Sequence, residues 1–373
     1  MNKTLIVILV SEQTIQNVQF LKWFFNTKLQ NADLLFISTT KMEEKNKSDC
    51  IKNALPNIAK YIDESKIVCV KENSLEDIKI IVSSLLNTWV HKNFVVNITG
   101  GTKLMSLVTY NIFSNLENTE IYYQPIAKNL QQVFPEQRSF EVTELITLEE
   151  YMKAYGISFK YDNNCLMDYD YNKNVFNKII KDNHDFIKPL VLLQNNKYFR
   201  NSFKRKDDID FLKNPKEKFT TQEGEIIDKN KVIETISKFP FDITRITKTQ
   251  LRYITGGWFE EFVYQKIKTE QNLSEQNIAL NVYIEKQGDK NELDVAYLDS
   301  NNKLHVIECK SFIEGKEGGK ILDDALYKLQ AIMKTKFGLN AVPHFFTQSE
   351  IEKDSSLIRA KEYGIQITDG KTL

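Results

Sequence analysis

Short apolar runs alternate with helical stretches through the first part of the chain, and this alternation constrains the fold more than any other feature. The runs lack strict polar alternation and lie at residues 4–10, 34–38, 67–70, 94–98 and 121–123. Strands of this kind are buried on both faces, as in a parallel sheet covered by helices on each side. We therefore expect an α/β, Rossmann-like domain over residues 1–145 that ends in an edge strand or a hairpin.

Helices are predicted between these runs. They are expected at residues 14–29, 75–88 and 103–116, with a polar helix that continues to about residue 60. A small connector is expected at residues 146–240, with helices at 148–155 and 171–185.

A C-terminal α/β domain is predicted over residues 241–373, and its centre is a β-hairpin. Residues 292–298 and 304–307 form two apolar strands, and the turn between them at residues 299–303 is made of hairpin-forming residues. A helix is expected at residues 323–335, after a loop at 315–319.

The two strands of this hairpin carry acidic and basic residues. The second strand ends in Glu308-Cys309-Lys310, and the first contains Asp294. Because side chains alternate along a strand, Glu308 and Lys310 project to one face, and the hairpin can bring Asp294 close to Glu308. Two carboxylates that hold Mg²⁺ or Mn²⁺ and a lysine that offsets developing charge suit metal-assisted phosphodiester hydrolysis. The alternative is a surface hairpin with a solvated Glu–Lys pair.

A helix precedes the hairpin and carries two further acids. Residues 256–267 have apolar side chains at helical spacing, and the helix would deliver Glu260 or Glu261 to the hairpin. The sequence leaves open which of the two it is.

A glycine-containing loop follows the strand at residues 94–98. Its hydroxyls, backbone amides and helix N-terminus suit a phosphate-bearing ligand, and its residues are Thr99, Gly100, Gly101, Thr102 and Lys103. It matches neither the dinucleotide-binding nor the Walker pattern. A tight turn without a ligand is the alternative. The loop after the first strand would line the same crevice, because ligands bind at the carboxyl ends of parallel strands.

The two patterns together resemble a known family. Glu-bearing helix, Asp294 and Glu308-x-Lys310 resemble the PD-(D/E)xK restriction-endonuclease-like superfamily. The Thr-Gly-Gly-Thr-Lys loop resembles the CRISPR-associated Rossmann-fold (CARF) sensors. The whole chain is similar to the CARF nucleases of type III CRISPR immunity, in particular the dimeric type with a single CARF domain per subunit. Residues 146–240 contribute little to this resemblance.

The resemblance implies a function and a set of site residues. It implies a homodimer that binds a cyclic oligoadenylate, specifically cyclic tetra-adenylate, and a Mn²⁺- or Mg²⁺-dependent endonuclease that cleaves single-stranded DNA and RNA and nicks supercoiled DNA. The implied ligand contacts are Ser11, Gln13, Thr14, Thr39 and the loop from Thr99 to Lys103. The implied catalytic residues are Asp294, Glu308, Lys310, Glu260 or Glu261, and Gln330, with the Cys309 carbonyl as a third metal ligand.

Composition limits the class of protein. Lysine plus arginine equals aspartate plus glutamate, 50 against 50, so no global basic surface indicates tight nucleic-acid binding. The four cysteines lack Cys-x-x-Cys spacing, which favours reduced thiols in a cytoplasmic protein. A signal peptide is not expected, and no apolar run of about 18 residues is present, so no membrane association is expected.

Two further functions remain open. One is a nucleotide-sensing regulator with an idle C-terminal domain. The other is a ring nuclease, in which the N-terminal domain degrades its own ligand, because Lys103 could assist phosphodiester cleavage.

Overall fold

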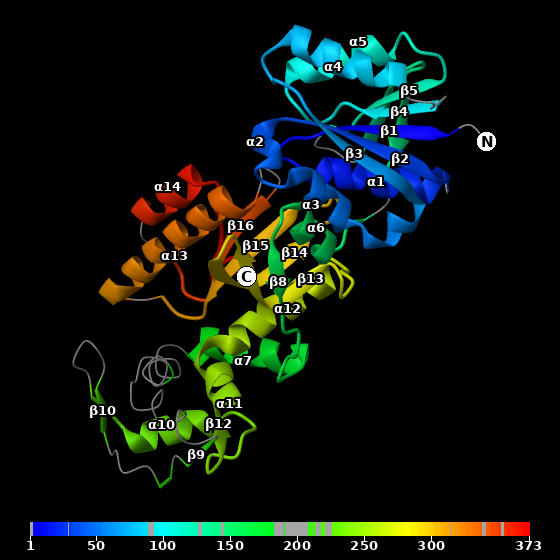
Figure 1. Ribbon diagram of the computed structural model, residues 1–373. Helices are drawn as coiled ribbons and strands as arrows, with labels where there is room; N and C mark the ends of the chain where they lie inside the picture. The colour runs from blue at the N-terminus through cyan, green and yellow to red at the C-terminus, as the bar shows by residue number, and fades with distance from the viewer. Residues whose placement is uncertain are drawn as a thin grey trace.

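Two large α/β parts and a smaller, mainly helical part make up the molecule (Figure 1). The computed structural model describes residues 3–28, 30–88, 93–125, 129–142, 145–182, 190, 208–210, 212–213, 218–220, 226–313, 315–337, 341–351 and 354–373. Within these residues, no helix is both long enough and apolar enough to cross a membrane.

The N-terminal part contains the predicted parallel sheet. Its strand order is β3-β2-β1-β4-β5-β6-β7, in which β1 to β5 are parallel and β6 and β7 add an antiparallel edge. The strands are β1 (Thr4–Leu9), β2 (Ala32–Ser38), β3 (Ile62–Cys69), β4 (Asn93–Asn97), β5 (Thr119–Tyr123), β6 (Asn129–Phe134) and β7 (Arg138–Glu141). The Rossmann-like topology and the antiparallel edge are as expected.

Helices cover both faces of this sheet, because successive strand residues are buried on opposite sides. Ile6 and Ile8 of β1 belong to one apolar cluster, and Leu5 and Val7 belong to another. The first face is covered by α1 (Ile15–Lys28), α3 (Lys47–Ala54) and α6 (Leu148–Ala154). The second is covered by α4 (Leu75–Thr88) and α5 (Lys103–Phe113), which lie at the top of Figure 1.

The polar helix predicted to reach about residue 60 is wrong as one element. It is divided into α2 (Thr40–Glu43), α3 and a 3₁₀ helix (Pro56–Tyr61). Asn46 has left-handed backbone angles, with φ 52° and ψ 36°, and this interrupts the helix between α2 and α3. Pro56 lacks a backbone N–H and cannot continue α3, so it begins the 3₁₀ turn instead.

The C-terminal part is a second sheet, with the predicted hairpin at its centre. The strand order is β17-β16-β15-β14-β13-β8. The strands β15, β16 and β17 are parallel, and the other neighbours are antiparallel. The strands are β8 (Ser158–Lys160), β13 (Ile278–Lys286), β14 (Asp289–Leu298), β15 (Leu304–Lys310), β16 (Ala341–Thr347) and β17 (Gln366–Thr368).

Helices pack on both sides of this sheet as well. They are α12 (Trp258–Glu270), α13 (Gly315–Lys336) and α14 (Asp354–Glu362). The loop predicted at residues 315–319 is wrong, because α13 already begins at Gly315. A Cβ at Gly318 would lie 2.7 Å from the Ile313 carbonyl carbon, so glycine there lets the start of the helix pack against the preceding backbone.

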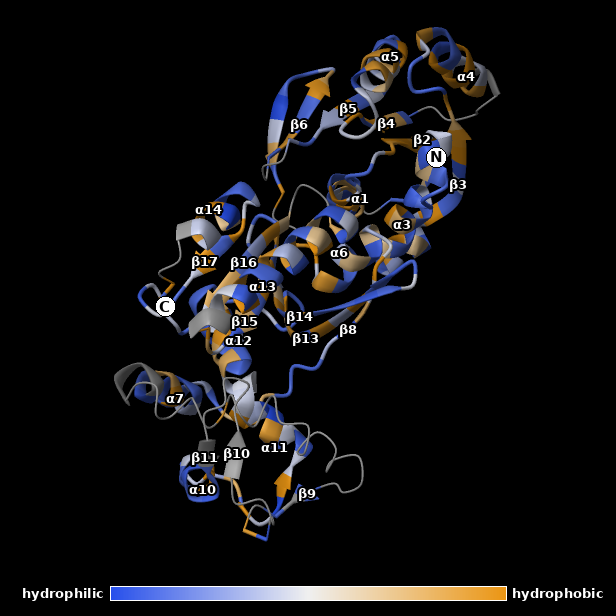
Figure 2. Ribbon diagram, turned by 90° about the vertical axis from the view of Figure 1, so that its left-hand side faces the viewer, coloured by the Kyte–Doolittle hydropathy of each residue, from blue (hydrophilic) through white to orange (hydrophobic). Residues whose placement is uncertain are grey.

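The smaller part lies on the far side of the C-terminal sheet from α4 and α5 (Figures 1 and 2). It packs against α12 through stacked rings, with Phe176 and Phe262 centroids 4.7 Å apart. Its elements are α7 (Tyr169–Asp182), β9 (Asp208–Ile209), β10 (Lys218–Thr220), β11 (Ile226–Asp228), α10 (Lys229–Ile236), β12 (Ile246–Thr247), α11 (Lys248–Arg252) and a π-helical turn (Tyr253–Gly257).

Residues 146–160 join the two sheets. α6 packs in the N-terminal core, and β8 adds to the edge of the C-terminal sheet. The backbone N–H of Ile146 donates to Asn302 Oδ1 at 2.7 Å, and Leu148 N–H donates to the Gln276 carbonyl at 2.9 Å. One apolar cluster therefore runs from β1 through α6 to β14 and β15.

Candidate functional site

The hairpin brings the predicted acidic side chains together. β14 and β15 pair with Val295 opposite Ile307, which places Asp294 beside Glu308. Asp294 Oδ2 accepts a hydrogen bond from the Cys309 backbone N–H at 2.6 Å. Asp294 is 8% exposed and Glu308 is 4% exposed, so both carboxyls lie inside the fold. A solvated Glu–Lys pair would lie at the surface, so this burial counts against the alternative of a surface hairpin.

Two lysines bind Glu308. Lys310 Nζ lies 2.6 Å from Glu308 Oε1 and 3.9 Å from Asp294 Oδ2. Lys328 Nζ, which comes from α13, lies 2.7 Å from the other oxygen, Glu308 Oε2. Both oxygens of this carboxylate are therefore held in place by positive charge.

Lys328 was not predicted from the sequence, whereas Gln330 on the same helix was. Among the described residues, Cys309, Lys310 and Lys328 form the hydrogen bonds and ion pairs to the two central carboxyls, and Gln330 forms none of them. Helical spacing in the sequence could have pointed to Lys328. Leu322, Ala325 and Leu329 are buried on the face of α13 that packs against the sheet, and residue 328 lies beside that face.

The structure distinguishes the two glutamates of α12. Glu261 is 7% exposed and accepts backbone N–H bonds from Leu166 at 3.0 Å and Met167 at 3.3 Å, so it holds the chain that leads into α7. Glu260 lies 3.5 Å from Arg252 and close enough to Asp294 to affect its protonation. Glu260 is thus the member of the pair next to the hairpin carboxyls.

Burial and like charges shift the protonation of this cluster. Burial raises the pKa of Asp294 well above its usual range, and the charges of Glu308 and Glu260 add to that effect. Burial also raises the pKa of Glu260. Burial acts to raise the pKa of Glu308 too, but Lys310 and Lys328 outweigh it and the pKa is lowered. Nearby positive charges therefore do not fully offset the burial of the Asp294 and Glu260 carboxylates, whereas they do so for Glu308.

The donor set suits a hard divalent cation. Asp294 and Glu308 offer carboxylate oxygens, and the Cys309 carbonyl, which accepts a bond from Lys310 Nζ at 3.0 Å, offers a third. In the described part of the chain, no group of three His, Cys, Asp or Glu side chains is arranged to hold a metal. A cation would also offset the repulsion that raises the pKa of Asp294.

Replacing the two α12 glutamates one at a time should separate catalysis from stability. Glu261→Ala removes an acceptor from two backbone N–H groups and should lower the free energy of unfolding by about 1.5–3 kcal/mol. Glu260→Ala should leave stability nearly unchanged and reduce the cleavage activity that the sequence resemblance implies. Urea unfolding and cleavage assays on both variants provide the measurement. A stable Glu261→Ala variant without activity would reverse the two roles.

A second candidate site lies at the carboxyl ends of β1 and β4. β1 is flanked by β2 and β4, so the strand order changes direction there, which is where ligands bind in open α/β sheets. Asn17 Nδ2 donates to the Leu9 carbonyl at 2.9 Å, and Asn97 Nδ2 donates to Asn17 Oδ1 at 2.9 Å. Both asparagines are fully buried. They were not predicted, although an amide at the end of an apolar strand was a signal, and they fix the two loops relative to each other.

The glycine-containing loop folds tightly against β1. A Cβ at Gly100 would lie 2.0 Å from the Leu9 carbonyl oxygen, and Gly101 has a φ of +73°. Both positions therefore require glycine for steric reasons. Thr99 Oγ1 accepts from the Gln124 N–H at 2.8 Å, so this hydroxyl is used within the loop.

The loop ends as the first turn of α5. Thr102 caps the helix, with its Oγ1 accepting from the Met105 N–H at 3.2 Å. Lys103 is the first residue of α5 and is exposed. The loop therefore presents a cation beside a helix N-terminus, which is the arrangement expected for an anionic ligand.

The loop after β1 faces α6. Gln13 Oε1 accepts from the Tyr155 hydroxyl at 3.1 Å, and Ser11 Oγ donates to the Gln13 carbonyl at 3.2 Å. Thr14 is fully buried and donates to the Ala154 carbonyl at 2.5 Å, so its hydroxyl points away from the crevice. These contacts connect the predicted ligand loop to the segment that joins the two sheets.

Thr39 lies one strand farther along the same edge. It caps α2 and is 6% exposed. It lines a hollow of about 460 Å³ at the ends of β2 and β3, together with Cys69 and Lys71. The structure thus places Thr39 next to a hollow whose loops differ from the loop that contains Thr99.

Family models account for nearly the whole chain. Residues 5–151 match the Card1 CARF domain, residues 162–248 match the Card1 hinge domain, and residues 247–372 match the Card1-like endonuclease domain. The three models occur in the order expected for one architecture. The chain belongs to the Card1-like CARF nucleases. The CARF domain contains the crevice at β1 and β4, and the endonuclease domain contains Asp294, Glu308 and Lys310.

Solved structures share this fold. Protein VC1899 from Vibrio cholerae has a TM-score of 0.74 at 18% identity, covering 99% of this chain and 94% of that chain. Can2 from Sulfobacillus thermosulfidooxidans, solved in complex with cyclic tetra-adenylate, has a TM-score of 0.66 at 21% identity, covering 98% and 95%. A type III CRISPR defence DNA nuclease activated by cyclic oligoadenylate has a TM-score of 0.54 at 13% identity, covering 94% of this chain and 46% of that chain. No curated protein sequence matches the chain.

Proposed function

We propose that the chain is an endonuclease of type III CRISPR antiviral defence that cyclic tetra-adenylate activates. The buried cluster of Asp294, Glu308 and Lys310 carries this proposal, because it combines two adjacent carboxylates with a lysine on a Card1-like endonuclease domain. The CARF crevice supplies the sensor. Can2, which has the same fold, was solved with cyclic tetra-adenylate, and this supports the choice of activator.

Each residue of the cluster has a defined task in this proposal. Asp294, Glu308 and the Cys309 carbonyl would hold Mn²⁺ or Mg²⁺, which supplies Lewis-acid activation of water and of the scissile phosphate. Lys310 would offset the negative charge that develops on the phosphate. Lys328 fixes the second oxygen of Glu308, and Glu260 lies beside the pair.

Single-stranded DNA and RNA are the proposed substrates, with nicking of supercoiled DNA. The chain carries equal numbers of acidic and basic residues, so tight non-specific binding of duplex DNA is not expected. A flexible single strand can instead enter a narrow groove and present its phosphate to the buried cluster. The proposed setting is the cytoplasm.

A regulator with an idle endonuclease domain is the second candidate. Such a regulator would not need the paired carboxylates of a nuclease site. Glu308 nevertheless lies inside the fold, where two lysines form ion pairs with it. Burying such charges is costly, and this favours a catalytic role. Degradation of the cyclic oligoadenylate would be an additional activity of the CARF domain, in which Lys103 would assist.

Incubation with labelled oligonucleotides tests the proposal. With Mn²⁺ and cyclic tetra-adenylate, the protein should cut single-stranded DNA and RNA and nick a supercoiled plasmid. EDTA should stop all three reactions and leave the binding of cyclic tetra-adenylate unchanged. Cleavage that persists in EDTA would contradict the metal-dependent site.

The protein is expected to be a two-fold dimer through its CARF domains, even without ligand. A cyclic tetra-adenylate has rotational symmetry, which two identical crevices on a closed dimer can match. Light scattering should give twice the chain mass of 43.5 kDa. A monomeric mass with and without ligand would contradict the dimer.

A further inference from the structure

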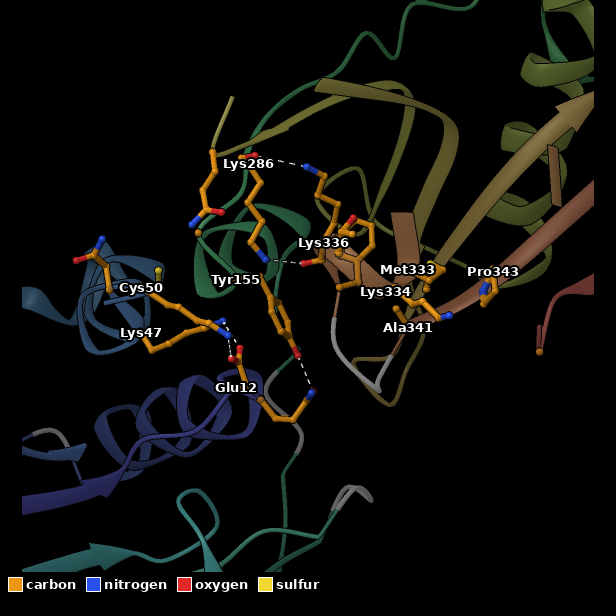
Figure 3. Close-up of a pocket in the computed structure, with 18 of the residues that line it drawn as sticks. Glu12, Lys47, Cys50, Tyr155, Lys286, Met333, Lys334, Lys336, Ala341 and Pro343 are labelled. Carbon is orange, nitrogen blue, oxygen red and sulfur yellow. Dashed lines mark hydrogen bonds and ion pairs between the residues drawn. The ribbon is translucent and has the colours of Figure 1, made fainter. Parts of the chain in front are cut away.

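A cavity of about 860 Å³ lies between the CARF domain and the endonuclease domain (Figure 3). Its walls come from the loop at residues 12–13, the start of α3, the β13–β14 hairpin, the C-terminal end of α13 and the start of β16. It shares only residues 12–13 with the CARF crevice and none with the endonuclease cluster. It is therefore distinct from both sites, and its volume is that of small-molecule sites, which span about 300–1,000 Å³.

Positive charge predominates in the cavity. One glutamate and five lysines line it, namely Glu12, Lys45, Lys47, Lys286, Lys334 and Lys336. The glutamate pairs with two of the lysines from the CARF side, and its Oε2 lies 3.2 Å from Lys47 Nζ. Lys336 is neutralised separately, by Asp289 at 2.5 Å.

Lys286 has no such partner. Its Nζ donates to the backbone carbonyl of Lys336 at 3.0 Å, and no carboxylate forms an ion pair with it among the residues that the structure describes. Burial and the charge of Lys47 lower the pKa of Lys286 to about 8. Lys47 lines the cavity from the CARF side and Lys286 from the endonuclease side (Figure 3), and their positive charges repel each other.

The remaining wall is apolar and aromatic. Met333, Phe337 and Pro343 line it on the endonuclease side, and Tyr155 lines it on the CARF side. Such a surface can pack against a nucleobase, while the lysines can hold phosphate oxygens through charge-assisted hydrogen bonds.

We propose that this cavity binds a phosphorylated ligand of nucleotide size, with its phosphates between Lys47 and Lys286 and its base against Met333 and Phe337. The ligand would replace a repulsion between the two domains with a shared ionic contact. Because Glu12 already binds Lys47, the ligand also competes with a residue of the β1 loop. Occupancy would therefore reach the CARF crevice through Ser11 and Gln13, the neighbours of Glu12.

Calorimetric titration with inorganic tripolyphosphate and with ATP at constant ionic strength tests the proposal. The wild-type protein should bind both, and ATP should bind more tightly because its base gains the apolar wall. Lys286→Gln should weaken both affinities by about tenfold or more, as expected for loss of one charge-assisted hydrogen bond. Only the affinity lost in this variant is assigned to the cavity, which separates it from any binding at the CARF crevice.

Lys290→Gln is the matched control, since Lys290 lies on the same hairpin, is 76% exposed and does not line the cavity. It should keep wild-type affinity. If Lys286→Gln fails to fold, Lys334→Gln, which alters an exposed lysine of the lining, should show the same direction of change. Equal losses in the Lys290 and Lys286 variants, no tripolyphosphate binding at millimolar concentration, or equal affinities for ATP and tripolyphosphate would each overturn the proposal.

Discussion

Glu308→Gln is expected to reduce cleavage of single-stranded DNA by about 10²- to 10³-fold, the scale on which a lost electrostatic contact at a reacting phosphate acts. Glutamine has the same shape, so the fold should survive. It lacks the charge that binds a cation, and it leaves Lys310 and Lys328 without their shared carboxylate. Single-turnover cleavage rates under saturating activator measure the effect.

Binding of cyclic tetra-adenylate should be unchanged in Glu308→Gln, because this residue lies in the endonuclease domain. Glu285→Gln is a suitable control, since Glu285 is an exposed glutamate on β13 that forms a long ion pair with Lys290, at 3.7 Å. It should cleave at the wild-type rate. Wild-type cleavage by Glu308→Gln would remove this residue from the catalytic site.

Lys103→Ala is expected to raise the activator concentration needed for half-maximal cleavage by about tenfold or more. Lys103 is exposed at the N-terminus of α5, beside the loop that Gly100 holds against β1. Removing its charge should weaken binding of an anionic ring. It should not change the rate at saturating activator, because the endonuclease cluster is unaltered. Cleavage rate against activator concentration measures both quantities.

Lys28→Ala is the control for this variant. Lys28 is an exposed lysine at the C-terminal end of α1, so it lies at the opposite edge of the CARF sheet from Lys103. Its activation curve should match the wild type. If Lys103→Ala also matched the wild type at limiting activator, the loop would not be the ligand site.

The contacts around α6 suggest how the two sites communicate. Gln13 binds Tyr155, Thr14 binds Ala154, and Asn277 Nδ2 donates to the Ile146 carbonyl at 2.9 Å. A ligand changes activity only if it binds one arrangement better than another. We propose that closure of the β1 loop around the ring displaces α6 and, through it, the strands that carry the catalytic carboxyls.

Local sequence patterns were sufficient to predict much of the fold. Buried strands such as β1 and β4 and the β14–β15 hairpin depend on periodicity and turn residues that are adjacent in the chain. The long polar helix and the loop at residues 315–319 were wrong, because Asn46 adopts left-handed angles and Gly318 packs on Ile313. Both depend on the conformation or tertiary packing of a single residue.

The candidate site, like the fold, could be predicted only where local sequence patterns determine it. The proximity of Asp294 to Glu308 follows from strand pairing and could be predicted. Lys328 reaches the site from a helix twenty residues farther along, at a distance that no local pattern specifies. The predicted domain boundaries at residues 145 and 240 and the ligand contacts of the CARF crevice stay predictions.

The cleavage rate of labelled single-stranded DNA, measured with Mn²⁺ in the presence and absence of cyclic tetra-adenylate, tests the central claim most directly. A resting enzyme that a ligand must activate should cut slowly alone and much faster with the ring, and Glu308→Gln should stay slow in both conditions. Equal wild-type rates with and without the ring, or no cleavage in either condition, would contradict an endonuclease that the CARF domain controls.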